Sequence, residues 1–228
     1  MPVLFFAIAL LVILLIFGPQ AWVRREMGRH AAPRPDLPGT GGELARHLLD
    51  RYQLQAVTVE ATPAGDHYDP DARAVRLSTE NHDGRSITAV AVAAHEVAHA
   101  IQHAQGSTLF AWRTALARFL SVFDKIAMAI LLTAPLVAIV TRAPMVGLVQ
   151  FGLAIALLGI GLVVHLVTLP LELDASFGKA LPILAGDGYL AETDLPAARG
   201  VLRAAAFTYV AGALIGLLNF LRILRIIR

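Results

Sequence analysis

One stretch constrains the fold and the chemistry of this chain more than any other: residues 86–106, SITAVAVAAHEVAHAIQHAQG. An alanine- and valine-rich run of helical length carries His95, Glu96 and His99 in the pattern H-E-x-x-H. Residues four apart lie on one face of an α-helix, so both imidazoles can converge on a single ion. Glu96 is rotated by about 100° from His95, which places its carboxylate beside such an ion, within reach of a bound water. The stretch therefore predicts a helix over 86–105 that carries two metal ligands and a general base.

The apolar surroundings of the motif favour a metal site over the alternative that its polar side chains simply face solvent. Ionisable side chains are costly to bury without a partner, and a metal ion is a partner that suits all three. Two imidazoles leave a tetrahedral zinc in need of one more protein ligand and an open position. The chain has no cysteine, so cysteine-ligated zinc, thiol nucleophiles and disulfide scaffolds are excluded.

The composition predicts the fold class. Hydrophobic residues make up 57% of the 228 positions and charged residues only 16%, whereas an ordinary soluble domain is nearer to about 25% charged. Apolar runs at 3–23, 126–141, 145–169 and 204–220 have lengths typical of, or close to, membrane-crossing helices. We therefore expect a mainly α-helical integral membrane protein with about four transmembrane helices and a small α+β portion. The net charge of +2, without a basic patch, argues against nucleic acid as a partner.

The same runs predict how the chain is organised. Arg24, Arg25 and Arg29 follow the first run, which places the next segment on the cytoplasmic side of a membrane. The expected parts are an N-terminal transmembrane helix (1–23), a membrane-associated part with the H-E-x-x-H helix (24–122), a transmembrane hairpin (123–170), a segment with the third metal ligand (171–203) and a C-terminal transmembrane or interfacial helix (204–228).

Local patterns predict the structure of the α+β portion. Thr40 and Glu43 fit a capping box that opens an amphipathic helix over 41–52. Residues 56–61 and 73–78 alternate in the manner of strands, and we expect them to pair as a short β-hairpin. This hairpin would either bind a peptide by strand addition or serve as a structural flap over the metal helix, and the sequence does not decide between the two.

The third ligand is expected downstream of the hairpin of apolar runs, because such a hairpin returns the chain to the side it left. Glu172 and Asp174 follow Pro170 directly. If Pro170 begins a new helix, these carboxylates point about 200° apart and only one can face the metal. We select Glu172 as the ligand, with Asp174 orienting an imidazole or serving as the alternative ligand. His103 lies about 12 Å along the helix from His95, which is too far to share an ion.

A family resemblance adds to these inferences. The phrases AAHEVAHAIQHA, DHYDP, RLS, TLPLELDAS and AAAFTYVAG occur in this order in the bacterial neutral zinc metallopeptidase family typified by YugP, and the resemblance covers roughly residues 20–228. Members of that family usually carry glycine where Ala98 stands and VEFDAS where this chain reads LELDAS. Neither difference falls on an expected ligand.

The resemblance implies a membrane-bound peptidase of the bacterial inner membrane that requires Zn²⁺. His95, His99 and Glu172 would bind the zinc, and Glu96 would be the catalytic base. We expect protein or peptide substrates, a lipid bilayer as the surroundings and an active site on the cytoplasmic side. Three residues are candidates for contacting substrate or its oxyanion: His67, Tyr68 and Tyr209. The alternative is a non-catalytic membrane scaffold or assembly factor with a structural zinc site. Oligomeric state and regulatory partners are not indicated by the sequence.

Overall fold

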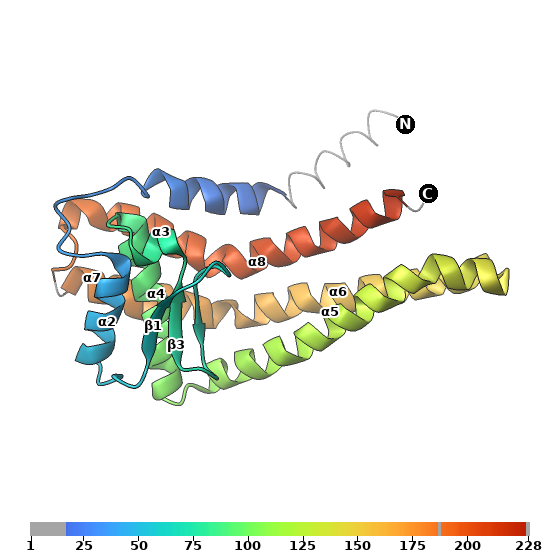
Figure 1. Cartoon of the computed structure of the whole chain (residues 1–228), viewed down its shortest axis with the longest axis horizontal. Helices are drawn as coiled ribbons and strands as arrows, with labels where there is room; N and C mark the ends of the chain where they lie inside the picture. The colour runs from blue at the N-terminus through green and yellow to red at the C-terminus, as the bar shows by residue number, and fades with distance from the viewer. Residues whose placement is uncertain (1–16, 187, 227–228) are drawn as a thin grey trace. The chain divides into compact units, whose positions relative to one another are not determined.

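The computed structural model describes residues 17–186 and 188–226 of the chain. These residues fold mainly into helices, with one small sheet. The chain forms two compact units, and Figure 1 labels their main helices and strands. Unit 1 comprises Met1–Gln20, Trp112–Thr168 and Tyr209–Arg228, and unit 2 comprises Ala21–Ala111 and Leu169–Thr208. The H-E-x-x-H motif and Glu172 belong to unit 2.

Helix α2 (Gly41–Arg51) begins where the sequence predicts. The Thr40 hydroxyl accepts a hydrogen bond from the Glu43 backbone amide, and the Glu43 carboxylate accepts one from the Thr40 amide. This capping box satisfies two amides that the first helical turn would otherwise leave without partners. Gly41 is required by packing, because a Cβ there would collide with the carbonyl of Asn81, near the end of the short helix α3 (Thr79–His82).

The sheet has three strands in the order β1–β3–β2. They are β1 (Thr58–Ala61), β2 (His67–Asp69) and β3 (Ala74–Leu77). The two expected strands exist, but their expected pairing as a hairpin is wrong, since β1 runs parallel to β3. The polar connection between them forms β2, which pairs antiparallel with β3 and makes the actual hairpin. Two strands joined by a connection long enough to cross over are free to pair in parallel, and alternation alone does not reveal this.

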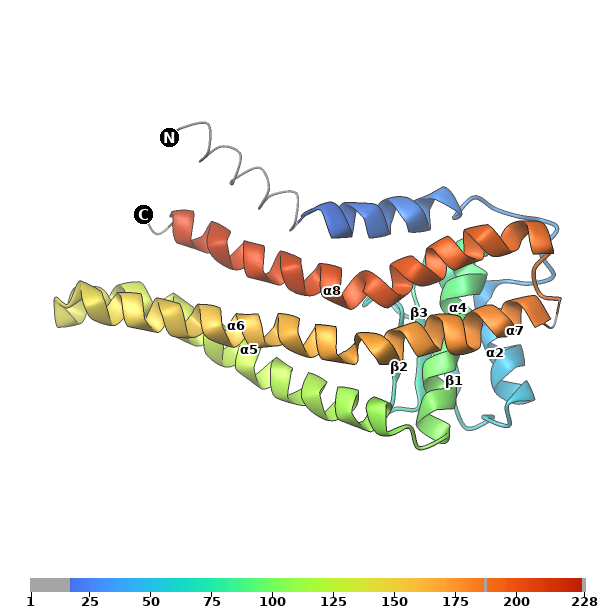
Figure 2. The ribbon, with the colours of Figure 1, turned by 180° about the vertical axis from the view of Figure 1, so that it is seen from behind.

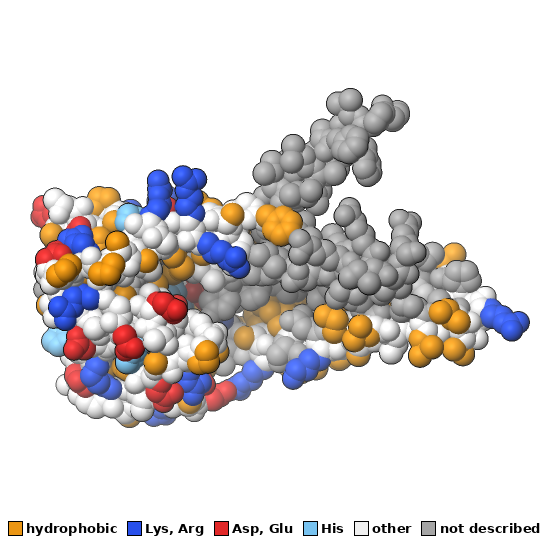
Figure 3. Space-filling model, turned by 45° about the horizontal axis from the view of Figure 1, so that its top comes forward, with side chains coloured by type: hydrophobic (Ala, Val, Ile, Leu, Met, Phe, Trp, Pro, Cys, Tyr) orange, Lys and Arg blue, Asp and Glu red, His pale blue; other side chains and the backbone are white. Residues whose placement is uncertain are grey.

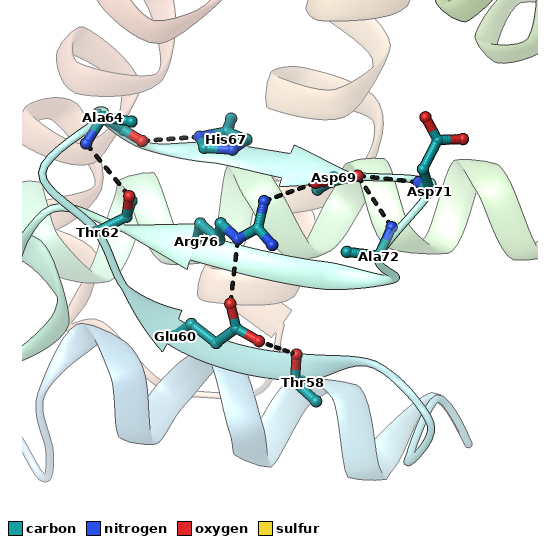
Figure 4. A network of polar contacts seen from close by, with 10 residues as sticks. Thr58, Glu60, Thr62, Ala64, His67, Asp69, Asp71, Ala72 and Arg76 are labelled. Atoms are coloured by element: carbon teal, nitrogen blue, oxygen red, sulfur yellow. Dashed lines mark hydrogen bonds and ion pairs between the residues drawn. The ribbon is translucent and has the colours of Figure 1, made fainter.

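Polar contacts join the three strands on one side of the sheet (Figure 4). Arg76 on the central strand donates to Glu60 on β1 at 3.0 Å and to Asp69 on β2 at 2.6 Å. Asp69 also accepts hydrogen bonds from the backbone amides of Ala72 and Asp71. The amide of Ala72 is the largest influence on the Asp69 carboxyl, and together these donors hold its pKa below the ordinary 3.8. The sheet is thus stabilised by an ionised carboxylate at the β2–β3 turn.

Helix α4 (Ile87–Ala104) is the buried centre of unit 2. The Ser86 hydroxyl accepts a hydrogen bond from the Ala89 amide and caps its first turn. Every residue from Ile87 to Gln102 is buried. Alanine and valine leave little side-chain bulk, so neighbouring elements can approach the helix from all sides. Helix α2, the sheet and the segment after residue 170 surround it, as Figure 2 shows from behind.

The expectation of an integral membrane protein with about four transmembrane helices is wrong for residues 17–186 and 188–226. None of the helices in this part of the chain combines the length and the apolar character needed to cross a membrane. Three of the expected apolar runs do lie inside helices: 126–141 in α5 (Thr108–Thr141), 145–169 in α6 (Pro144–Leu173) and 204–220 in α8 (Leu195–Ile226). An apolar run thus predicts a helix, but it does not by itself establish that the helix crosses a membrane. Of the expected first helix, residues 1–16 lie outside the described residues, and 17–29 are helical.

The segment after the second apolar run also differs from its prediction. Pro170 does not begin a new helix but lies inside α6 (Pro144–Leu173). The chain then continues without a break into a π-helix, η1 (Asp174–Ala180), and a short helix, α7 (Leu181–Gly186). A proline in a helix interior removes one backbone hydrogen bond, yet the helical conformation continues through Pro170. A 3-10 turn, η2 (Glu192–Asp194), leads into α8.

Candidate metal centre

Helix α4 presents the two histidines of the motif side by side. The imidazoles of His95 and His99 have their ring centres 4.7 Å apart, and both side chains are almost completely buried. Glu96 is the most accessible of the motif's ionisable side chains, with 7% of its surface exposed. The four-residue spacing therefore places both imidazoles on one face of the helix, as predicted. Glu96 lies on a neighbouring part of the helix surface.

Glu172, in the last turn of α6, brings a carboxylate to both imidazoles. Its Oε2 lies 3.4 Å from His95 Nε2 and 3.1 Å from His99 Nε2. One donor atom from each of the three residues lies within 4.8 Å of the others. Ligand atoms about 2.0–2.2 Å from a tetrahedral zinc are about 3.3 Å apart. Two of the observed separations match this value, so the three residues fit a zinc ion.

The hydrogen bond on the far side of the His95 ring sets its tautomer. Ser176, in η1, donates its hydroxyl proton to the carbonyl of Leu202 in α8 at 2.9 Å. With its only proton used there, the hydroxyl can only accept from His95 Nδ1, which lies 3.0 Å away. His95 is thus protonated on Nδ1, and its Nε2 lone pair faces Glu172 and the shared position.

His99 has a different partner. Its Nδ1 lies 2.9 Å from the side-chain oxygen of Gln102, one turn further along α4. The Gln102 amide nitrogen donates to the carbonyl of Leu171 and to Asp174, which also accepts from Lys179. Burial raises the pKa of Asp174, but hydrogen bonds from Lys179 and Gln102 outweigh it and leave the pKa below the ordinary 3.8. Asp174 is therefore ionised at neutral pH.

His103 lies away from the three converging donors, at the end of α4. Its Nδ1 is 2.9 Å from the hydroxyl of Tyr68 on β2, and its ring stacks on Phe110 at 5.1 Å. Phe110 also contacts the ring of His99. Burial raises the pKa of the Tyr68 phenol above its ordinary 10.0, so Tyr68 keeps its proton at neutral pH. Through Phe110, these aromatic rings lie beside His99.

The other candidates from the sequence are placed as follows. His67 is half-buried on β2, with its Nδ1 2.8 Å from the carbonyl of Gly65. Tyr209 belongs to α8, but its side chain lies outside the described residues. Asp174 contacts Gln102 and Lys179 rather than lying among the three converging donor atoms.

The sequence analysis did not identify Ser176 and Gln102, although the spacing of both residues from the candidate ligands indicates them. Gln102 is a polar residue three positions after His99 in an otherwise apolar helix, and Ser176 follows Glu172 by four positions. Each spacing puts the residue on the same helix face as a candidate ligand. The significance of these positions emerges only when α4 and η1 are seen to pack together.

Known proteins resemble this chain over nearly its whole length. Residues 5–228 match the family described as "Putative neutral zinc metallopeptidase". The chain belongs to this family. It is 33% identical over 214 residues to "Putative membrane protease YugP" of Bacillus subtilis (strain 168), an alignment that covers 93% of this chain and 91% of that protein. No solved structure matches the chain.

Membership of the zinc metallopeptidase family confirms the resemblance noted in the sequence. It also confirms the predicted cofactor, which is Zn²⁺. The described residues contain one group of His, Asp and Glu side chains that could hold such an ion: His95, His99 and Glu172. Family membership and side-chain geometry therefore agree on the metal.

Proposed function

We propose that this chain is a zinc-dependent endopeptidase whose metal ligands are His95 Nε2, His99 Nε2 and the Glu172 carboxylate. The observation that carries the proposal is the convergence of these donors, with Nδ1 of each imidazole engaged by a separate partner. Bound zinc would supply Lewis acidity, polarising a substrate carbonyl and lowering the pKa of a water in its open position.

Glu96 is the proposed proton carrier. It follows His95 on the helix and retains some exposure, so its carboxylate can take a proton from the attacking water. The same carboxyl group then returns the proton to the nitrogen of the departing amine, which completes hydrolysis of the peptide bond. Among the candidates whose side chains the structure describes, we select Tyr68 as the donor of a hydrogen bond to the substrate oxyanion, because its phenol keeps its proton at neutral pH.

The edges of the sheet offer a place for a peptide. β1 and β2 are the outer strands, and β2 contacts α4. An extended substrate adding to one of these edges would form backbone hydrogen bonds independent of its sequence. This supports protein or peptide segments in extended conformation as the substrate class.

The number of protein ligands to the zinc distinguishes a catalytic site from the structural zinc site of a non-catalytic scaffold. Structural zinc sites have four protein ligands, whereas catalytic sites have three and an open position. The described residues supply three. His103, the remaining histidine of α4, lies away from them, with its Nδ1 at the Tyr68 hydroxyl.

We also propose that the peptidase works at a membrane. The name of its relative supports this, and so does the surface of unit 1, where large apolar side chains are 62 to 73% exposed: Leu132, Leu136, Ile139, Val140, Met145 and Val149. Exposed apolar clusters mark surfaces that contact lipid or protein. On the face of unit 2 in Figure 3, by contrast, acidic and basic side chains are interspersed. A cytoplasmic location of the site stays a prediction from Arg24, Arg25 and Arg29.

The decisive experiment replaces Glu96 with glutamine. Glu96→Gln should bind one zinc per chain like the wild type but lose hydrolysis of an unfolded protein by at least about a hundredfold, because the amide cannot carry the proton. Glu192→Gln, an exposed glutamate in η2, is the matched control and should keep full activity. Full activity in Glu96→Gln would overturn the mechanism, and a zinc-loaded wild type with no peptidase activity would favour the scaffold.

A further inference from the structure

Gln102 is a completely buried polar side chain, with 1% of its surface exposed, on the helix that carries both motif histidines. All of its side-chain contacts lie beside the metal centre. The oxygen faces His99 Nδ1 at 2.9 Å, and the nitrogen faces the Leu171 carbonyl at 3.1 Å and Asp174 Oδ2 at 2.8 Å. Each hydrogen-bonding group of the amide therefore has a partner, which a buried amide requires.

The contacts determine which way the amide points. Its nitrogen faces two acceptors, the Leu171 carbonyl and the Asp174 carboxylate that forms an ion pair with Lys179. In the flipped orientation, the Gln102 oxygen would face both acceptors, so a charge-assisted hydrogen bond would be replaced by repulsion. The Lys179 ammonium, 2.7 Å from Asp174 Oδ2, keeps that carboxylate in place.

The fixed amide in turn determines the proton position on His99. Because the Gln102 oxygen can only accept, His99 must carry its proton on Nδ1. Its Nε2 lone pair then points towards Glu172 Oε2, where the donors converge. His95 reaches the same tautomer through Ser176 without any charged group. Of the two motif histidines, it is His99 that Gln102 connects to the Asp174–Lys179 ion pair, which lies in η1 shortly after the third proposed ligand.

We propose that Gln102 is a positioning residue of the zinc site, whose amide, oriented by the Asp174–Lys179 ion pair, holds His99 in the zinc-binding tautomer. The inference rests on the proposed ligand set. It makes the segment 171–179 contribute twice to the site, through the Glu172 carboxylate and through the partners of Gln102.

The test uses the full-length chain and zinc alone. Gln102→Met keeps the side-chain length but removes every hydrogen bond, and it should lower zinc affinity by about 10- to 100-fold in competition with a chelator. Gln105→Met, the same change at the exposed end of α4, is the control and should bind zinc like the wild type. In zinc-loaded protein with ¹⁵N-labelled histidine, the His99 Nδ1–H resonance should be protected from exchange in the wild type and lost in Gln102→Met.

A second variant covers the case in which Gln102→Met does not fold. Asp174→Ala acts at a half-exposed position, and it should weaken zinc binding while increasing exchange of the His99 Nδ1–H proton. Wild-type affinity and an unchanged histidine spectrum in the folded variants would overturn the role of Gln102. A wild type that binds no zinc through His95, His99 and Glu172 would instead overturn the proposed function, so the two failures are distinguishable.

Discussion

Zinc removal should loosen two segments that are distant in sequence. His99 and Glu172 are 73 residues apart, so any opening that separates α4 from the end of α6 also separates the ligands. Free zinc buffered at 1,000 times its Kd stabilises the closed state by about 4.1 kcal/mol. Amides that exchange through such an opening should therefore exchange about 1,000-fold more slowly with zinc than with chelator.

Hydrogen exchange followed by mass spectrometry measures this effect peptide by peptide. Peptides covering α4 and residues 171–176 should gain protection together, whereas helix-end amides that open without parting the ligands should not change. Glu172→Ala should abolish most of the gain, and Glu192→Ala, at an exposed position, should retain it. Equal protection by zinc in the wild type and Glu172→Ala would refute the ligand assignment, and protection of α4 alone would refute the coupling of the two segments.

Two further predictions concern stability. Ser86→Ala should lower the free energy of unfolding by about 1 kcal/mol in urea denaturation, because the Ala89 amide loses its cap; an unchanged midpoint would show that the cap contributes nothing. Asp69→Asn should destabilise the protein at pH 7 but progressively less below pH 3.8, since a carboxyl whose folded pKa is depressed contributes stability that is lost as pH falls through that pKa. A difference between wild type and Asp69→Asn that is the same at pH 7 and pH 3 would contradict this.

Short-range patterns in the sequence predict the elements that short-range forces decide. The capping box at Thr40 and Glu43 starts α2 at the expected residue. The H-E-x-x-H helix, expected over 86–105, is observed as Ile87–Ala104. The contacts involved lie within four residues of one another, so the local sequence is sufficient to specify them.

Elements that depend on distant partners were harder to predict. The parallel pairing of β1 with β3 and the inclusion of β2 depend on backbone partners along the sheet, which alternation does not encode. Pro170, which a local reading places at the start of a new helix, lies inside α6, although an interior proline removes one backbone hydrogen bond. The apolar runs predict transmembrane helices, but none of the helices in the described part of the chain meets the length and apolar character needed to cross a membrane.

In the candidate metal centre, too, some features follow from the local sequence and others depend on long-range packing. The local sequence is enough to specify two imidazoles and a carboxylate at helical spacing, because the period of the α-helix is a local property. The positions of Ser176, Gln102 and Asp174 around them follow from long-range packing. A histidine's tautomer depends on which group meets its second nitrogen, and here those groups arrive from α4 itself and from η1, more than 70 residues later in the chain. The packing of η1 on α4 thus orients the imidazoles that the motif supplies.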